Sequence, residues 1–190
     1  MDAYRLLLRA ESAGYGTIGA FAAALIGVLV WACLSVPWPV LFATIVQGWL
    51  LAILSIIDAR TMTLPRELNV FLGALGALFI WQFDPGLLPL HLVAAVAGWT
   101  ALALVGWSYR RLRHRDGLGI GDAWLFGAGA IWVGPAGLPS VLAIAAFSGL
   151  IVMIAWSWRL GERIDGASAV PFGPFLALGI WLTWIHGPVL

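Results

Sequence analysis

Two carboxylates stand at the ends of apolar runs, where an ionisable side chain needs an explanation. Asp58 follows the uncharged run 38–57, and Asp122 follows GLGIG and begins the run AWLFGAGAIWV. A charge against a membrane helix is costly and therefore marks a candidate functional site. Two carboxylates that share a site cannot both ionise easily, so such a pair can activate water and protonate a leaving amine. The pair predicts aspartic-protease chemistry, and separate interfacial charges marking helix ends are the alternative.

The elements that must position these acids are membrane helices. The chain has 190 residues, of which 62% are hydrophobic and 10% charged, outside the range of soluble domains. Because a spanning helix needs about 20 apolar residues, we expect an all-α bundle of about seven transmembrane helices. They form a single membrane-embedded domain over residues 1–190, in which residues 1–13 are a cytoplasmic N-terminal tail. The expected helices cover residues 15–34, 38–57, 68–83, 90–109, 122–133, 138–158 and 170–185.

The loops between these segments are of two kinds. The stretches SVPWP, DPGLLP and GPAGLP predict tight turns, because proline and glycine end helices. The other loops and the N-terminal tail contain all ten basic residues, and all ten are arginine. By the positive-inside rule that face is cytoplasmic, which places the N-terminus inside and both carboxylates at the cytoplasmic face. A net charge of +1 gives no electrostatic reason to expect a nucleic-acid partner.

Small and turn-forming residues surround both acids. Gly119 and Gly121 could adopt backbone conformations closed to other residues and permit close approach of another chain, such as an extended substrate peptide. Leu64 and Pro65 follow Asp58, and the proline should stop the chain from continuing as a helix. No set of histidines and acids has metal-ligand spacing, so we expect neither a metal nor a cofactor.

Three stretches together resemble the type IV prepilin peptidases, membrane aspartic proteases of the GxGD kind. Asp58 is followed by ARTMTLP, which matches the family's aspartate with Leu/Ile-Pro six and seven residues later. RHRDGLGIGD ends in Asp122 and matches the basic loop and GxGD. VPFGPFLALG, at residues 170–179, matches the C-terminal Pro-Phe-Gly-Pro segment.

The resemblance implies that Asp58 and Asp122 are the catalytic pair. It implies that Gly119 and Gly121 shape the loop around the second aspartate, and that the segment containing Pro171, Gly173 and Pro174 supports the site from the start of the last helix. The implied substrate is a prepilin or pseudopilin precursor, whose basic leader is cleaved at the cytoplasmic face of the inner (cytoplasmic) membrane.

The sequence departs from the family pattern in three respects. It lacks the region with paired Cys-x-x-Cys motifs that many members carry, so the implied form is a short peptidase without methyltransferase activity. Trp124 stands where many members have lysine, and Arg66 stands where many have Asp or Asn. The two substitutions indicate either a divergent substrate or lost activity. An inactive relative in pilus or secretion assembly, or a proton- or ion-handling membrane protein, is therefore the alternative function. The sequence does not indicate an oligomeric state.

Overall fold

The computed structural model describes residues 26–113, 118–160 and 170–189, which are helical apart from short connections and contain no strand. The expected tail 1–13 and the start of the first expected helix lie outside the described residues, and a short apolar helix covers Ile26–Ser35. The chain forms two compact units, Met1–Trp49 and Leu50–Leu190. Both carboxylates belong to the second unit.

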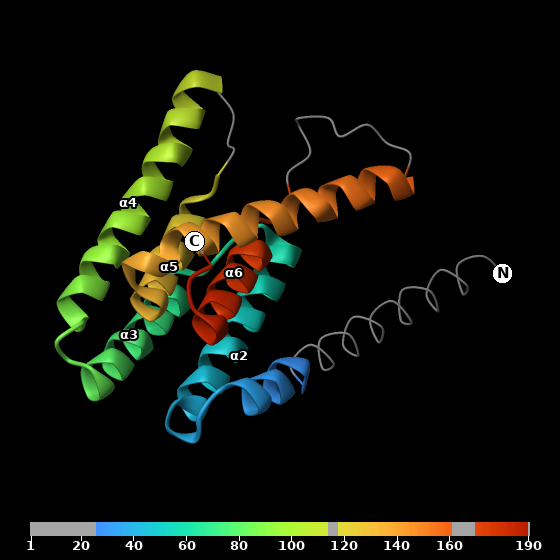
Figure 1. Cartoon of the computed structure of the whole chain (residues 1–190). Coiled ribbons are helices and arrows are strands. Elements are labelled where there is room, and N and C mark those ends of the chain that lie inside the picture. Colours follow the sequence, from blue (N-terminus) through green and yellow to red (C-terminus); the bar gives the residue numbers. More distant parts are fainter. Residues whose placement is uncertain (1–25, 114–117, 161–169, 190) are drawn as a thin grey trace. The chain divides into compact units, whose positions relative to one another are not determined.

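Helices occupy each of the expected segments within the described ranges (Figure 1). Their bounds differ from the expectation at several ends near the site, and the third and fifth expected helices each begin two residues early, at Arg66 and Ile120. The helix expected to end at residue 57 continues through the aspartate, because an acidic side chain does not interrupt backbone hydrogen bonding. The last helix begins three residues later than expected. The five longer helices are α2 (Trp38–Thr61), α3 (Arg66–Phe83), α4 (Leu88–Arg113), α5 (Ile120–Leu160) and α6 (Gly173–His186).

Helix α5 is broken at Gly134, where the sequence GPAGLP predicts a turn. Gly134 has φ 68° and ψ −178°, a left-handed conformation that favours glycine. Before the break, Gly129 packs against Ile180 of α6, and the rings of Trp132 and Trp184 meet edge to face at 5.2 Å. Because both residue numbers increase together, the first half of α5 runs parallel to α6.

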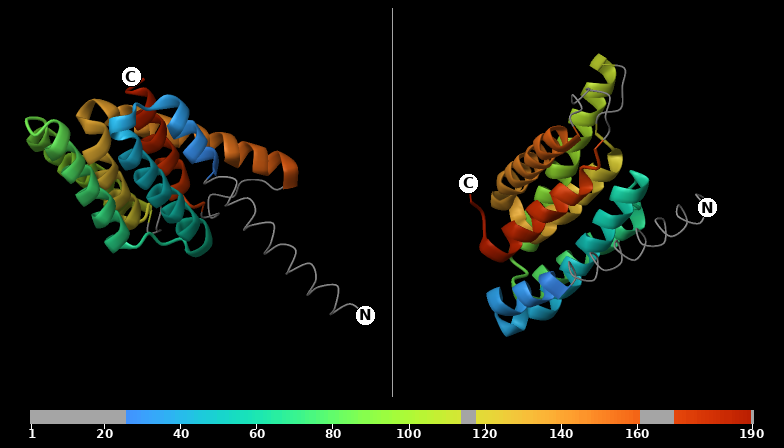
Figure 2. Two further views of the ribbon diagram at one scale, coloured as in Figure 1. Left: turned by 90° about the horizontal axis from the view of Figure 1, so that it is seen from below. Right: turned by 90° about the vertical axis from the view of Figure 1, so that its right-hand side faces the viewer.

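The second half of α5 runs in the opposite direction along α6. The carbonyl oxygen of Val141 lies against Gly179, and Gly149 lies against the ring of Phe175. Residue numbers now rise on α5 while they fall on α6, so the chain reverses at the break. Both views in Figure 2 show the two helices side by side, and α5 also packs against α3 and α4.

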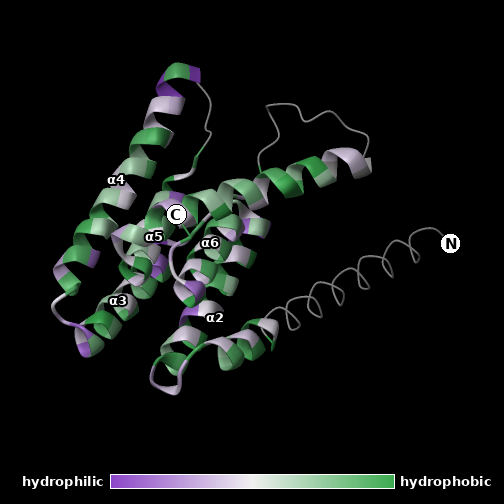
Figure 3. Cartoon of the chain, in the orientation of Figure 1, coloured by the Kyte–Doolittle hydropathy of each residue, from purple (hydrophilic) through white to green (hydrophobic). Residues whose placement is uncertain are grey.

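The surface of the described helices is strongly apolar, which identifies an integral membrane protein. Large side chains on α4 and α5 are exposed, with Val96 and Phe147 both 67% exposed. In Figure 3 the helices are coloured mainly as hydrophobic or intermediate residues, with few strongly hydrophilic ones. Such exposure fits side chains that face lipid. Three stretches are long and apolar enough to cross a membrane, namely Trp38–Thr61, Leu88–Arg113 and Ile120–Ala155.

Candidate active site

Asp58 lies in the last turn of α2 and is almost completely buried, with 5% of its surface exposed. The helix ends three residues later at Thr61, and the N–H of the next residue, Met62, donates to the carbonyl oxygen of Asp58 at 2.8 Å. Met62 has φ 52°, in the left-handed region that a non-glycine residue rarely enters. The turn at Met62 therefore ends α2, whereas we expected Pro65 to do so; Pro65 instead precedes the first turn of α3.

The carboxylate of Asp58 accepts a hydrogen bond from the start of α6. The backbone N–H of Gly173 donates to Asp58 Oδ2 at 2.9 Å, joining residues that are 115 positions apart in the chain. A Cβ on residue 173 would lie 2.7 Å from that oxygen, so the approach requires glycine. Pro174 occupies the first turn, where its missing N–H costs no helical hydrogen bond, and Pro171 precedes the helix.

Asp122 lies in the first turn of α5 and is 7% exposed. Its Oδ2 accepts a hydrogen bond from the N–H of Gly119 at 3.1 Å, and its own N–H donates to the carbonyl oxygen of Gly119 at 3.1 Å. These two bonds close a small loop around the carboxylate. They use N–H groups that would otherwise lack partners at a helix start.

The start of α5, just before Asp122, packs directly against the segment that follows Asp58. A Cβ on Gly121 would lie 2.8 Å from Leu64 Cβ, so a side chain at residue 121 would collide with the leucine. Within the described ranges, positive φ angles among glycines occur only at Gly134 and Gly187, so the unusual backbone expected at Gly119 and Gly121 is absent. The close approach at Gly121 is made by Leu64 of the same chain.

These contacts bring the three sequence stretches together. Asp58 contacts the start of α6, and Leu64, in the segment that follows Asp58, contacts Gly121, which directly precedes Asp122 in the first turn of α5. Two buried carboxylates thus lie at the meeting point of a helix C-terminus and two helix N-termini. This arrangement can hold one proton between two acids and can therefore perform acid–base chemistry on a peptide bond.

The packing at Gly121 gives a direct test of how the two acids are held. We expect Gly121→Ala to reduce the free energy of unfolding by about 1–3 kcal/mol, because the added methyl group overpacks against Leu64. Gly119→Ala is the matched control, since its Cβ would meet Asp122 Oδ2 at an ordinary 3.4 Å. Thermal unfolding in detergent measures both variants. Equal melting temperatures for the two would contradict the described contact.

The sequence model of the type IV leader peptidase family matches residues 45–154. The chain belongs to this family. The matched region includes both aspartates, Leu64 and the loop before Asp122, and it ends before the Pro-Phe-Gly-Pro segment.

Several curated members of the family are similar to this chain, and each is named a prepilin leader peptidase/N-methyltransferase. The protein from Pectobacterium carotovorum is 34% identical over 143 residues, covering 75% of this chain and 50% of that protein. The Escherichia coli K12 protein is 40% identical over 139 residues, covering 70% and 60%. The Aeromonas salmonicida protein is 32% identical over 166 residues, covering 86% and 55%. The chain thus spans about half the length of these relatives. No solved structure matches it.

Sequence reasoning missed the left-handed turn at Met62, since the surrounding residues TMT include no glycine or asparagine to signal it. It also missed the contact between Arg66 and Trp124, which were considered separately. Histidine, cysteine and acidic side chains in the described part of the chain form no group of three that could hold a metal ion.

Proposed function

We propose that the chain is a membrane aspartic endopeptidase that removes the basic leader from prepilin or pseudopilin precursors. The observation that supports this most directly is the packing of Leu64 on Gly121, which brings two buried carboxylates, Asp58 and Asp122, to one end of the bundle in a member of the type IV leader peptidase family. The curated relatives are named for the same reaction.

In the proposed reaction the two carboxyl groups share one proton. The ionised carboxylate takes a proton from water, and the resulting hydroxide oxygen attacks the carbonyl carbon of the scissile peptide bond. The protonated carboxyl gives its proton to the leaving amine nitrogen as the C–N bond breaks. Water is added across the bond, and the pair again holds one proton.

Backbone hydrogen bonds keep both carboxylates in place during this exchange. Gly173 donates to one oxygen of Asp58, and Gly119 donates to one oxygen of Asp122. These donors belong to helix starts, whose positive ends favour negative charge. We propose that Leu64 and Gly121 set the separation of the two acids, since they join the segments that carry them.

We also propose that this site opens on the cytoplasmic face of the inner membrane, in a bundle of seven crossings with the N-terminus inside. The last turn of α4 contains Arg110, Arg111 and Arg113, and Figure 3 shows that end of α4 as hydrophilic. A Cβ on Gly106 of the same helix would lie 3.1 Å from the carbonyl oxygen of Leu118, four residues before Asp122. The arginine-rich end and the carboxylate therefore lie at one end of the bundle, which the positive-inside rule makes cytoplasmic.

The test is cleavage by the purified full chain in detergent. A type IV prepilin from the same genome is incubated with the protein, and the products are measured by mass spectrometry. We expect two products, the basic leader and the mature protein that begins at its hydrophobic helix. Recovery of intact precursor alone, from protein that unfolds cooperatively on heating, would exclude the peptidase function and leave the ion-handling or assembly alternatives.

A further inference from the structure

A cation–π contact lies beside the two acids. The guanidinium carbon of Arg66 stands 4.7 Å from the ring centroid of Trp124. Arg66 begins α3, immediately after Leu64 and Pro65, and Trp124 is two residues after Asp122. A guanidinium within about 6 Å of a tryptophan ring is attracted to its electron-rich face. The contact thus links the helix turn that carries one acid to the segment that follows the other.

The contact between Arg66 and Trp124 is the first of a series of contacts along which α3 packs on α5. Further along the two helices, Gly73 packs against Ala128, and a Cβ on Gly76 would meet the ring of Trp132. Residue numbers increase together on both helices, so α3 and α5 run in the same direction. The arginine and tryptophan therefore meet where the two helices begin, at the end that holds the carboxylates.

The tryptophan ring is also supported from a third helix. Trp99 of α4 lies with its ring centroid 5.6 Å from that of Trp124, and the two planes are tilted by 59°. The ring is therefore contacted by Trp99 on one helix and by the Arg66 guanidinium on another. Trp124 is half-buried, whereas Arg66 is exposed. The ring is therefore held by its neighbours, and the arginine side chain packs against it from the solvent side.

We propose that Arg66 and Trp124 form a clamp that positions Asp122 relative to Asp58, and that neither residue contacts substrate. Asp122 and Trp124 lie two residues apart at the start of α5, so a shift of the backbone that carries the ring also shifts the carboxylate. A small misplacement of a reacting group can lower a rate by up to about 100-fold. The two residues that depart from the family pattern are thus one matched pair, and their presence is compatible with an active enzyme.

This inference rests on the proposed peptidase function, and its test uses kcat and KM for prepilin cleavage by the purified full chain. We expect Arg66→Gln to lower kcat about 5-fold to 10-fold with KM unchanged, because the cation is lost while the substrate surface is kept. Arg66→Lys and Trp124→Phe retain a cation and an aromatic face, so we expect both to stay within about 3-fold of wild type.

Charge exchange gives the sharpest version of the test. Trp124→Lys places a second cation next to the Arg66 guanidinium. Because the two like charges repel, we expect kcat to fall about 30-fold or more. The double variant Arg66→Asp/Trp124→Lys restores attraction at the same place and should recover kcat to within about 5-fold of wild type. Arg111→Gln is the matched control. It removes the cation of another pair, Arg111 over the ring of Trp107 at 5.9 Å, and should leave kcat unchanged.

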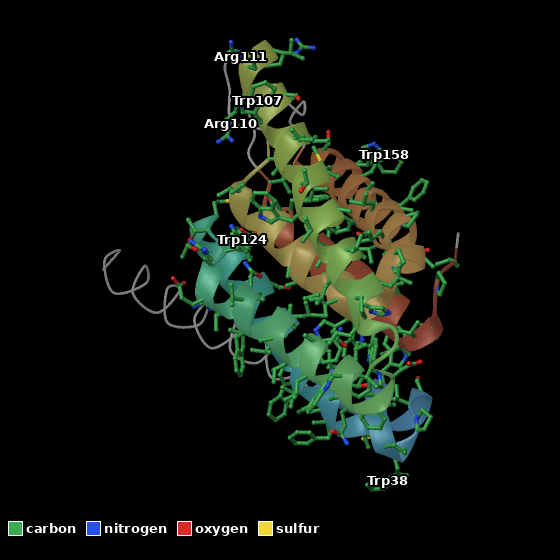
Figure 4. All side chains as sticks on the ribbon, turned by 90° about the vertical axis from the view of Figure 1, so that its left-hand side faces the viewer. Trp38, Trp107, Arg110, Arg111, Trp124 and Trp158 are labelled. Carbon is green, nitrogen blue, oxygen red and sulfur yellow. The ribbon has the colours of Figure 1, made fainter. Side chains whose placement is uncertain are left out.

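Figure 4 shows Trp107 and Arg111 together at the end of α4, apart from Trp124. The clamp is contradicted if Arg66→Gln keeps kcat within 2-fold of wild type, or if the double variant is no faster than Trp124→Lys. Melting temperatures of the same variants separate the two proposals. If wild type cleaves nothing, the peptidase function is excluded. In that case a double variant that melts at a higher temperature than Trp124→Lys would support the clamp, and an equal or lower melting temperature would contradict it.

Discussion

Asp58→Asn and Asp122→Asn each lower kcat for leader removal by on the order of 1,000-fold or more, because the chemistry needs two carboxyl groups that exchange protons. Asparagine keeps the size of the side chain and an oxygen that can accept the bonds from Gly173 and Gly119. The site should therefore keep its shape while losing the ability to take a proton from water or to donate one to the amine.

The melting temperature distinguishes this loss from unfolding. Each asparagine variant replaces a buried carboxyl group, whose ionised form is costly to bury, by a neutral amide, so both variants should melt at or above the temperature of wild type. Asp84→Asn, at the exposed C-terminal end of α3, is the matched control and should keep full activity. Leader removal is measured by mass spectrometry, and cleavage within 10-fold of wild type by either site variant would refute the paired-acid account.

Gly173→Ala should produce the second largest loss, a fall in kcat of about 10-fold to 100-fold. The added Cβ would lie 2.7 Å from Asp58 Oδ2 and 3.0 Å from its Cγ, closer than non-bonded atoms approach. Either the carboxylate or the first turn of α6 must move, and the hydrogen bond from the Gly173 N–H is weakened. The loss concerns the position of a reacting group, so it should appear mainly in kcat.

Gly149→Ala serves as the control for that substitution. It adds the same methyl group at the contact between α5 and α6, where its Cβ would meet the Phe175 ring at an ordinary 3.4 Å. We expect its kcat to stay within about 2-fold of wild type. If Gly173→Ala and Gly149→Ala had the same kcat, the close contact between α6 and Asp58 would play no part in positioning the acid.

Local sequence signals predicted much of the helical arrangement. The Pro- and Gly-rich stretch GPAGLP predicted the reversal at Gly134, and it is found there because glycine accepts a positive φ and proline cannot continue a helix. The apolar runs predicted where helices lie, because in lipid every backbone N–H and C=O group needs a hydrogen-bond partner within the protein, and a helix supplies these partners locally. Helix ends were less predictable: α2 passes Asp58 because its end depends on the backbone of Met62, which the sequence does not signal.

The contacts that assemble the site could not be read from local sequence. Gly173 reaches Asp58 across 115 positions, and Leu64 reaches Gly121 across a helical hairpin. The sequence suggested that Gly121 permits an unusual backbone conformation or the close approach of another chain, whereas in the structure Gly121 packs against Leu64 of the same chain. Long-range pairs depend on how helices pack, and helix packing depends on many side chains at once.

The most direct test of the central claim compares four preparations on one prepilin substrate: wild type, Asp58→Asn, Asp122→Asn, and an equimolar mixture of the two variants. Mass spectrometry reports the fraction of precursor that has lost its leader. If both acids act within one chain, only wild type removes the leader, and the mixture remains as inactive as its components. Substantial leader removal by any of the three mutant preparations would contradict the claim that Asp58 and Asp122 of the same chain form the catalytic pair.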